Sequence, residues 1–131
     1  MEFCQGGSLI DIMKKNKHFS EQSVAHIMKQ LLSALAYLHS MNIVHRDIKL
    51  DNIVALSEDS DGFISIKIID FGTATKLSAF RTKGKICGTR SYMAPEVFQG
   101  KVNVKSDVWS SGVFLYLLFM GKFPFMANSL L

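Results

Sequence analysis

The chain has 131 residues, of which 48% are hydrophobic and 20% are charged. This is the composition of one modest globular domain, and it excludes disorder and collagen-like repeats. Two cysteines are too few for a disulfide scaffold and no secretory leader opens the chain, so a reducing, cytoplasmic location is expected. The longest apolar run, Val113 to Met120, is much shorter than the roughly 20 residues of a membrane span. The formal charge of +4 is spread without a basic cluster, so nucleic acid is not an expected partner.

Two helices are predicted in the first third of the chain. The short one lies between Ser8 and Lys15, and its buried side is formed by Leu9, Ile12 and Met13. The long one begins after Ser20, which is a good N-cap residue, and ends near Asn42. Its apolar residues recur with the spacing of one helix face, and they are Val24, Ile27, Met28, Leu31, Leu32, Leu35 and Leu38.

A β-hairpin is predicted next. Apolar residues at 53–56 and alternating apolar residues at 63–69 form its strands, and the polar residues 57–62 form its turn. Because a hairpin brings its outer ends side by side, Asn52 and Asp70 should become neighbours.

The last third is expected to hold a long loop and one apolar helix. The polar stretch that contains Gly72, Gly84 and Gly88 predicts the loop. The helix is predicted from Ser106 to Met120, with Ser106 and Asp107 as its cap. Past Gly112 it is almost entirely apolar, and such a helix is expected to be buried on all sides.

Three short strings occur together, namely HRDIKLDN at residues 45–52, DFG at 70–72 and APE at 94–96. Their order, with the hairpin between the first two, matches the protein-kinase signature set. The chain therefore resembles a eukaryotic protein kinase of the serine/threonine type, closest to the calcium/calmodulin-dependent and calcium-dependent kinases. The resemblance runs from MEFCQGGSL, which is similar to a kinase hinge, to SDVWSSG, which is similar to the central helix of the larger lobe.

This resemblance implies an α+β fold, mostly α, with a small β-hairpin. Residues 1–131 would form a partial kinase domain that contains the hinge, the catalytic loop, the activation segment and the central helix. The small lobe and the last helices of the larger lobe are expected to be absent, together with the arginine that would pair with Glu96.

Phosphoryl transfer needs an aligned nucleophile and cations around a triphosphate. Asp47 is the candidate base for the substrate hydroxyl, and Lys49 offers a positive charge to the transferring group. Asn52 and Asp70 offer the hard oxygen ligands that suit Mg²⁺. Asp and Asn also favour turns for local hydrogen-bonding reasons, so Asp47, Asn52 and Asp70 could each be an ordinary turn residue. The occurrence of all three inside two intact motifs argues against that alternative.

The resemblance also implies an ATP site. The main chain of Glu2 and Cys4 would bind the adenine, and Val54 would form the apolar floor under it, although an ordinary core valine fits equally well. His45 and Phe71 resemble members of a hydrophobic stack.

Three further features concern the catalytic loop and the activation segment. Asp107 resembles the buried aspartate that ties the catalytic loop to the central helix. Lys49 together with Thr89 is similar to the pattern of kinases that modify Ser or Thr of a protein substrate. Where a regulatory phosphoacceptor would stand, two residues before Cys87, the chain has Lys85. Thr82 and Ser78 are nearby candidates for that phosphate, and Thr82 is the one proposed here, although a surface hydroxyl is more often simply solvated.

The 131 residues contain no glycine-rich loop and no strand lysine of the kinase type. By themselves they are therefore expected to bind ATP weakly and to be nearly inactive, because positioning is most of the catalytic effect. The apolar helix from Val108 to Met120 would lose part of its covering, which favours self-association. Two alternatives stay open: a non-catalytic truncated kinase that acts as a protein-binding module, and an incomplete gene model of a whole kinase.

Overall fold

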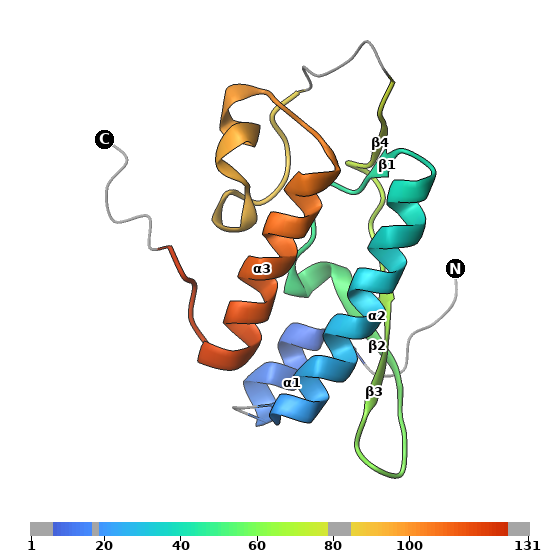
Figure 1. Ribbon diagram of the computed structural model, residues 1–131. Helices are drawn as coiled ribbons and strands as arrows, with labels where there is room; N and C mark the ends of the chain where they lie inside the picture. Colours follow the sequence, from blue (N-terminus) through green and yellow to red (C-terminus); the bar gives the residue numbers. More distant parts are fainter. Residues whose placement is uncertain (1–6, 17–18, 79–84, 126–131) are drawn as a thin grey trace.

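The computed structural model describes residues 7–16, 19–78 and 85–125 (Figure 1). Glu2, Cys4 and Thr82 lie outside these residues, so their expected roles are proposals. The fold is α+β and mostly helical, as predicted. Its elements in chain order are α1 (Leu9–Asn16), α2 (Glu21–Ser40), β1 (Ile43–Val44), the 3₁₀ helix Leu50–Asn52, β2 (Ile53–Glu58), β3 (Ile64–Ile68), β4 (Thr75–Lys76), the 3₁₀ helices Arg90–Tyr92 and Pro95–Gln99, and α3 (Val104–Met120).

Helix α2 lies at the centre of the molecule, where it packs against α3 and against β3 (Figure 1). Its predicted N-cap is confirmed, because the Ser20 hydroxyl accepts a hydrogen bond from the Ser23 amide at 3.1 Å. The predicted apolar face is buried except at Leu38, which is partly buried, and at Leu32, which is 45% exposed. Leu32 follows the buried Leu31 by about 100° around the helix, so it lies outside the arc that faces the core.

Strands β2 and β3 form the predicted antiparallel hairpin. Ile53 pairs with Ile68, and the register shifts by one residue at Leu56, which is the extra residue of a bulge in β2. At the open end, the Ile69 amide donates to the Asn52 carbonyl at 2.9 Å. The hairpin therefore joins the segment after the catalytic-loop motif to the segment that leads into Asp70.

A second, two-residue ladder was not predicted. Strand β1 pairs antiparallel with β4, with Val44 opposite Thr75. The expected long loop after Asp70 is thus not without structure, since it contains β4 and two 3₁₀ helices. Strands of two residues are too short to show an alternating pattern, so the sequence carries no signal for them.

The predicted cap of α3 is wrong. The helix begins at Val104 after Asn103, whose side-chain oxygen accepts from the Lys105 amide at 2.7 Å. Ser106 lies one turn inside the helix and completes a capping box, because its hydroxyl accepts from the Asn103 amide at 3.4 Å. Asp107 does not cap the helix; its buried carboxylate is turned toward the catalytic loop.

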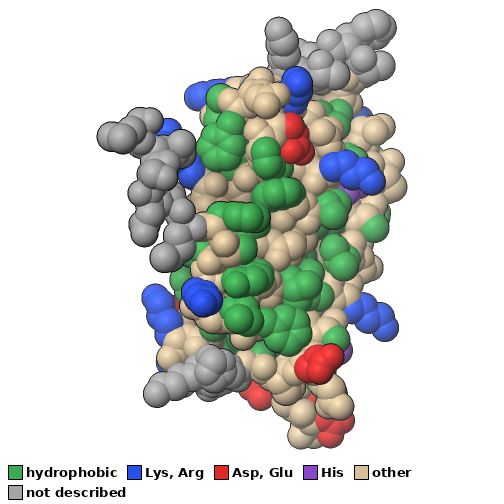
Figure 2. Space-filling view, turned by 60° about the vertical axis from the view of Figure 1, so that its left-hand side comes forward, with side chains coloured by type: hydrophobic (Ala, Val, Ile, Leu, Met, Phe, Trp, Pro, Cys, Tyr) green, Lys and Arg blue, Asp and Glu red, His purple; other side chains and the backbone are tan. Residues whose placement is uncertain are grey.

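Helix α3 is not buried on all sides. One face packs into the core through Val113, Phe114, Leu117 and Leu118, whereas Val108, Trp109, Tyr116, Phe119 and Met120 are exposed. Figure 2, in which the left-hand side of Figure 1 comes forward, shows hydrophobic side chains gathered on this side of the molecule. Across the described residues, no helix combines the length and the apolar character that crossing a membrane requires.

Candidate active site

Asp107 anchors the catalytic loop from inside the core. The carboxylate is 1% exposed, and it accepts hydrogen bonds at 2.9 Å from the backbone amides of His45 and Arg46. The His39 Nε2 atom lies 2.9 Å from the same carboxylate. These contacts agree with the role that the resemblance implied for Asp107. They help Arg46 to hold its left-handed φ of 71°, since its own amide and that of His45 are both held by the carboxylate.

His45 connects the catalytic loop to the end of the hairpin. Its Nε2 atom lies 3.2 Å from the Ile69 carbonyl, and its Nδ1 atom lies 3.3 Å from the Asp47 amide. A carbonyl only accepts and an amide N–H only donates, so these partners assign a neutral imidazole that is protonated at Nε2. The ring also meets Phe71 edge to face, with centroids 4.9 Å apart, which agrees with the expected stack.

Asp47, Lys49 and Asn52 meet directly. The Lys49 ammonium lies 3.0 Å from Asp47 Oδ2, and the Asn52 amide nitrogen lies 3.2 Å from that oxygen. The same nitrogen donates to the Asp47 carbonyl at 2.8 Å. The 3₁₀ turn Leu50–Asn52 folds the motif back, so that the Asn52 side chain reaches Asp47. Both residues are buried.

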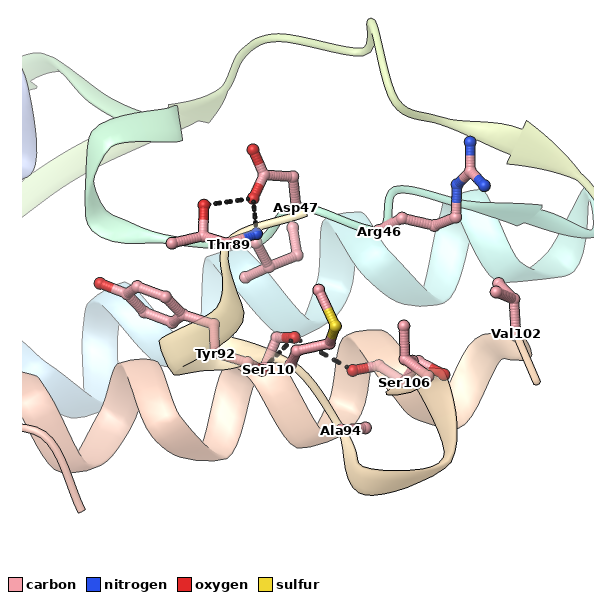
Figure 3. Close-up of a pocket in the computed structure, with 11 residues that line it drawn as sticks. Arg46, Asp47, Thr89, Tyr92, Ala94, Val102, Ser106 and Ser110 are labelled. Atoms are coloured by element: carbon pink, nitrogen blue, oxygen red, sulfur yellow. Dashed lines mark hydrogen bonds between the residues drawn. The ribbon is translucent and has the colours of Figure 1, made fainter. Parts of the chain in front are cut away.

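Thr89 brings the activation segment onto the same carboxylate (Figure 3). Its amide and its hydroxyl donate to Asp47 Oδ1 at 2.9 Å and 2.8 Å. The Lys49 ammonium donates to the Thr89 hydroxyl at 3.0 Å. Gly88 makes this approach possible, because its φ is +104° and a Cβ there would collide with the Arg46 carbonyl.

These contacts set the charge state of Asp47. Burial raises the pKa of its carboxyl, but the hydrogen bonds from Lys49 and Thr89 and the Lys49 charge together outweigh burial, so the net pKa is lowered. Asp47 is therefore ionised at neutral pH. Tyr92, just below, behaves differently: burial is the main cause that raises the pKa of its phenol to about 12.

The pocket beneath this cluster is small. It is drawn in Figure 3, between the catalytic loop, the activation segment and α3. The free space is about 10 Å³, which is on the scale of one water molecule and far below the volume of a ligand site. The tight packing holds Thr89 against Asp47 and leaves no room there for a nucleotide.

Asp70 lies next to Asn52 through the hairpin backbone, but it takes no part in the Asp47 cluster. Its carboxylate is exposed, its φ is +60°, and Oδ1 accepts from the Gly72 amide at 3.1 Å. Both hydrogen bonds of the Asn52 side chain use its nitrogen, which leaves the amide oxygen for a cation. One carboxylate and one amide oxygen suit Mg²⁺, which binds few protein ligands and keeps several waters.

Two other predicted residues have mixed outcomes. Val54 is 9% exposed and forms an isolated bridge with Ser8, so it does contribute to the core as the plainer interpretation held. Glu96 was expected to lack its arginine partner. In the structure its carboxylate oxygen accepts a hydrogen bond from the Ser106 hydroxyl of α3 at 3.4 Å, which does not test that expectation.

Sequence reasoning missed two residues that support the loop. His39 faces Asp107, and Thr73 uses its hydroxyl to donate to the His45 carbonyl at 3.0 Å. The Thr73 carbonyl also accepts from the Arg46 guanidinium. A histidine in the last turn of a helix and a threonine after a turn are common, so neither carried a specific signal.

Comparisons with known proteins agree with this geometry. The protein kinase domain family matches residues 1–130. Calcium-dependent protein kinase 6 of Plasmodium berghei is 45% identical over 98% of the chain, and serine/threonine-protein kinase 33 of Bos taurus is 44% identical over 98%. Serine/threonine-protein kinase PEPKR2 of Arabidopsis thaliana is 42% identical over 99%.

The chain spans only part of these relatives. It covers 9% of the Plasmodium protein, 28% of the bovine protein and 27% of the Arabidopsis protein. The match nevertheless extends over almost every residue of this chain, and its relatives include calcium-dependent and other serine/threonine kinases. The chain belongs to the protein kinase family.

Proposed function

We propose that this chain is part of an ATP-dependent protein serine/threonine kinase, which transfers the γ-phosphoryl group of ATP to a Ser or Thr hydroxyl of a protein. Residues 1–131 would supply the hinge, the catalytic loop, the activation segment and the central helix of the larger lobe. The observation that carries the proposal is the cluster in which Lys49, Asn52 and Thr89 all contact the carboxylate of Asp47.

Asp47 would orient the substrate hydroxyl and accept its proton. The carboxylate is ionised, and the 2.8 Å contact from the Thr89 hydroxyl supports the view that a hydroxyl can approach it closely. Lys49 lies beside it, where its ammonium would stabilise charge on the transferring phosphoryl group. Asp107 and Asn52 would hold this geometry, because Asp107 accepts from the His45 amide and Asn52 donates to the Asp47 carbonyl.

Asn52 and Asp70 would hold Mg²⁺ by their side-chain oxygens. Bound there, the ion would neutralise part of the charge of the triphosphate. The main chain of Glu2 and Cys4 and the side chain of Val54 would contact the adenine of ATP. The relatives named above are themselves kinases, so the comparisons do not favour a purely non-catalytic module.

By itself the 131-residue chain is expected to transfer phosphate very slowly. It contains neither the glycine-rich loop nor the strand lysine that hold the ATP phosphates in the family. Positioning of the reactants supplies most of the rate in phosphoryl transfer. A purified chain that is monomeric, melts cooperatively and phosphorylates a generic substrate would contradict this expectation.

The test of the proposed function uses the longest protein that the transcript encodes. Labelled γ-phosphate transfer is measured to peptides that differ only in carrying Ser, Thr or Tyr. Wild type is expected to modify the Ser and Thr peptides, and Asp47→Asn is expected to lower kcat by about 100-fold or more. Asp51→Asn, which removes an exposed carboxylate of the same turn, is the matched control. Equal rates for wild type and Asp47→Asn would refute the assignment.

A further inference from the structure

The open edge of β3 faces helix α2. The 2.9 Å bond between Ile69 and Asn52 identifies these residues as a hydrogen-bonded pair of the ladder. In an antiparallel pair the backbone groups of successive residues point alternately toward and away from the partner strand. The amides and carbonyls of Ile64 and Ile66 therefore point away from β2.

The side chain of Gln30 satisfies this edge. Its Oε1 atom accepts from the Ile66 amide at 2.9 Å, and its Nε2 atom donates to the Ile64 carbonyl at 2.9 Å. One amide group thus makes both kinds of bond that a neighbouring strand would make. The partners are 34 and 36 residues away in sequence, so these bonds join two separate elements.

A second contact lies one turn earlier on α2. The His26 ring stacks on Phe63, with centroids 5.0 Å apart and an interplanar angle of 22°. Helix α2 therefore contacts the residue just before β3 by a ring stack, and the strand itself by the Gln30 amide. Beyond the strand, Ile69 bonds both Asn52 and His45, so the position of β3 determines where the candidate metal ligands lie.

We propose that Gln30 is a positioning residue: its amide closes the edge of β3 and so fixes the hairpin that places Asn52 and Asp70 beside the catalytic loop. This inference rests on the proposed function, since it concerns the metal ligands of that site. Gln30 does not touch the reacting groups. It acts through β3 on the residues that would bind the metal.

The test compares Gln30→Met with Gln22→Met in the 131-residue chain. Methionine is a helix former of similar length without hydrogen-bonding groups. Gln22 lies on the same helix but is exposed, so its replacement is a matched control. The first readout is hydrogen exchange of the Ile66 amide. The second is the affinity for Mn²⁺ alone, measured by electron paramagnetic resonance at a temperature where each variant is fully folded.

For Gln30→Met, Ile66 exchange is expected to rise about fivefold or more, since the net loss of a typical hydrogen bond is of that size. Mn²⁺ affinity is expected to fall about threefold to tenfold, whereas Gln22→Met should match wild type in both readouts. A merely structural role would lower the melting temperature but leave Mn²⁺ affinity of the folded protein unchanged. Unchanged affinity or unchanged Ile66 exchange would overturn the proposal.

Asp70→Asn separates this proposal from the proposed function. If Asp70→Asn binds Mn²⁺ as tightly as wild type, the metal assignment fails, and Ile66 exchange alone decides whether Gln30 closes the edge. If Gln30→Met does not fold, Gln30→Glu replaces it, because its carboxylate has no donor for the carbonyls of Ile64 and His26 and places a second acceptor against them. Faster Ile66 exchange than in wild type would then support the proposal, and exchange within about twofold of wild type would refute it.

Discussion

Replacement of Asp107 by Asn tests whether one buried carboxylate holds the catalytic loop. The carboxylate accepts from two backbone amides and lies 2.9 Å from His39 Nε2. An asparagine has a single acceptor oxygen. If that oxygen keeps the contacts with His45 and His39, the new amide nitrogen faces the Arg46 amide, donor against donor.

The expected loss of stability follows from these contacts. A lost hydrogen bond to a charged group costs about 1.5–3 kcal/mol, and a buried donor left without a partner costs about 1–3 kcal/mol more. The two remaining bonds also weaken when the charge is removed. Together these give a loss of about 3–5 kcal/mol, which is the usual cost of breaking a buried charged network. That is a large part of the stability of a domain of this size.

The assay is urea unfolding followed by circular dichroism at neutral pH. Asp51→Asn removes an exposed carboxylate and should stay within about 0.5 kcal/mol of wild type. His39→Gln and the double variant complete a mutant cycle. The loss of stability in the double variant should be smaller than the sum of the two single losses, because both residues share one contact. If Asp107→Asn unfolds within about 1 kcal/mol of wild type, the anchoring role of this carboxylate is refuted.

Three more predictions concern the site and the helix next to it. Gly88→Ala should lower the free energy of unfolding by more than about 1 kcal/mol, because φ is +104° and the new Cβ meets the Arg46 carbonyl; an unchanged urea midpoint would contradict this. Lys49→Met should raise the pKa of Asp47, measured by carboxyl NMR titration. In wild type the lowered pKa of Asp47 stabilises the fold at pH values above the pKa of this group in the unfolded chain, and this stabilisation is lost as the pH falls through the folded-state pKa. Lys49→Met should therefore lose the stabilisation at a higher pH than wild type. Identical titration curves would refute the coupling. Asn103→Ala should cost about 1 kcal/mol through loss of the N-cap of α3, and a melting temperature equal to that of wild type would show that the cap contributes nothing.

Much of the fold was predictable because its signals are local. The N-cap at Ser20, the helical spacing of α2 and the alternation of the hairpin each depend on residues within a few positions of one another. The spacing inside the catalytic-loop motif is local too, so the contact between Asp47 and Asn52 follows from a single 3₁₀ turn. The motifs and their order were enough to indicate the family.

Other features could not be derived from a local pattern, because they depend on groups that are distant in sequence; for Asp107, only the family resemblance implied the tie to the catalytic loop. Ser106 and Asp107 are of residue types that often cap helices. Nevertheless Asn103 caps α3, and Asp107 accepts from backbone amides that are 61 and 62 residues away in sequence. Leu32 matched the apolar spacing but lies outside the packed arc. Thr89 meets Asp47 across 42 residues, and Gln30 meets Ile66 across 36. A local pattern determines which element forms, whereas only the packing of elements decides which polar group finds a partner and which apolar face stays exposed.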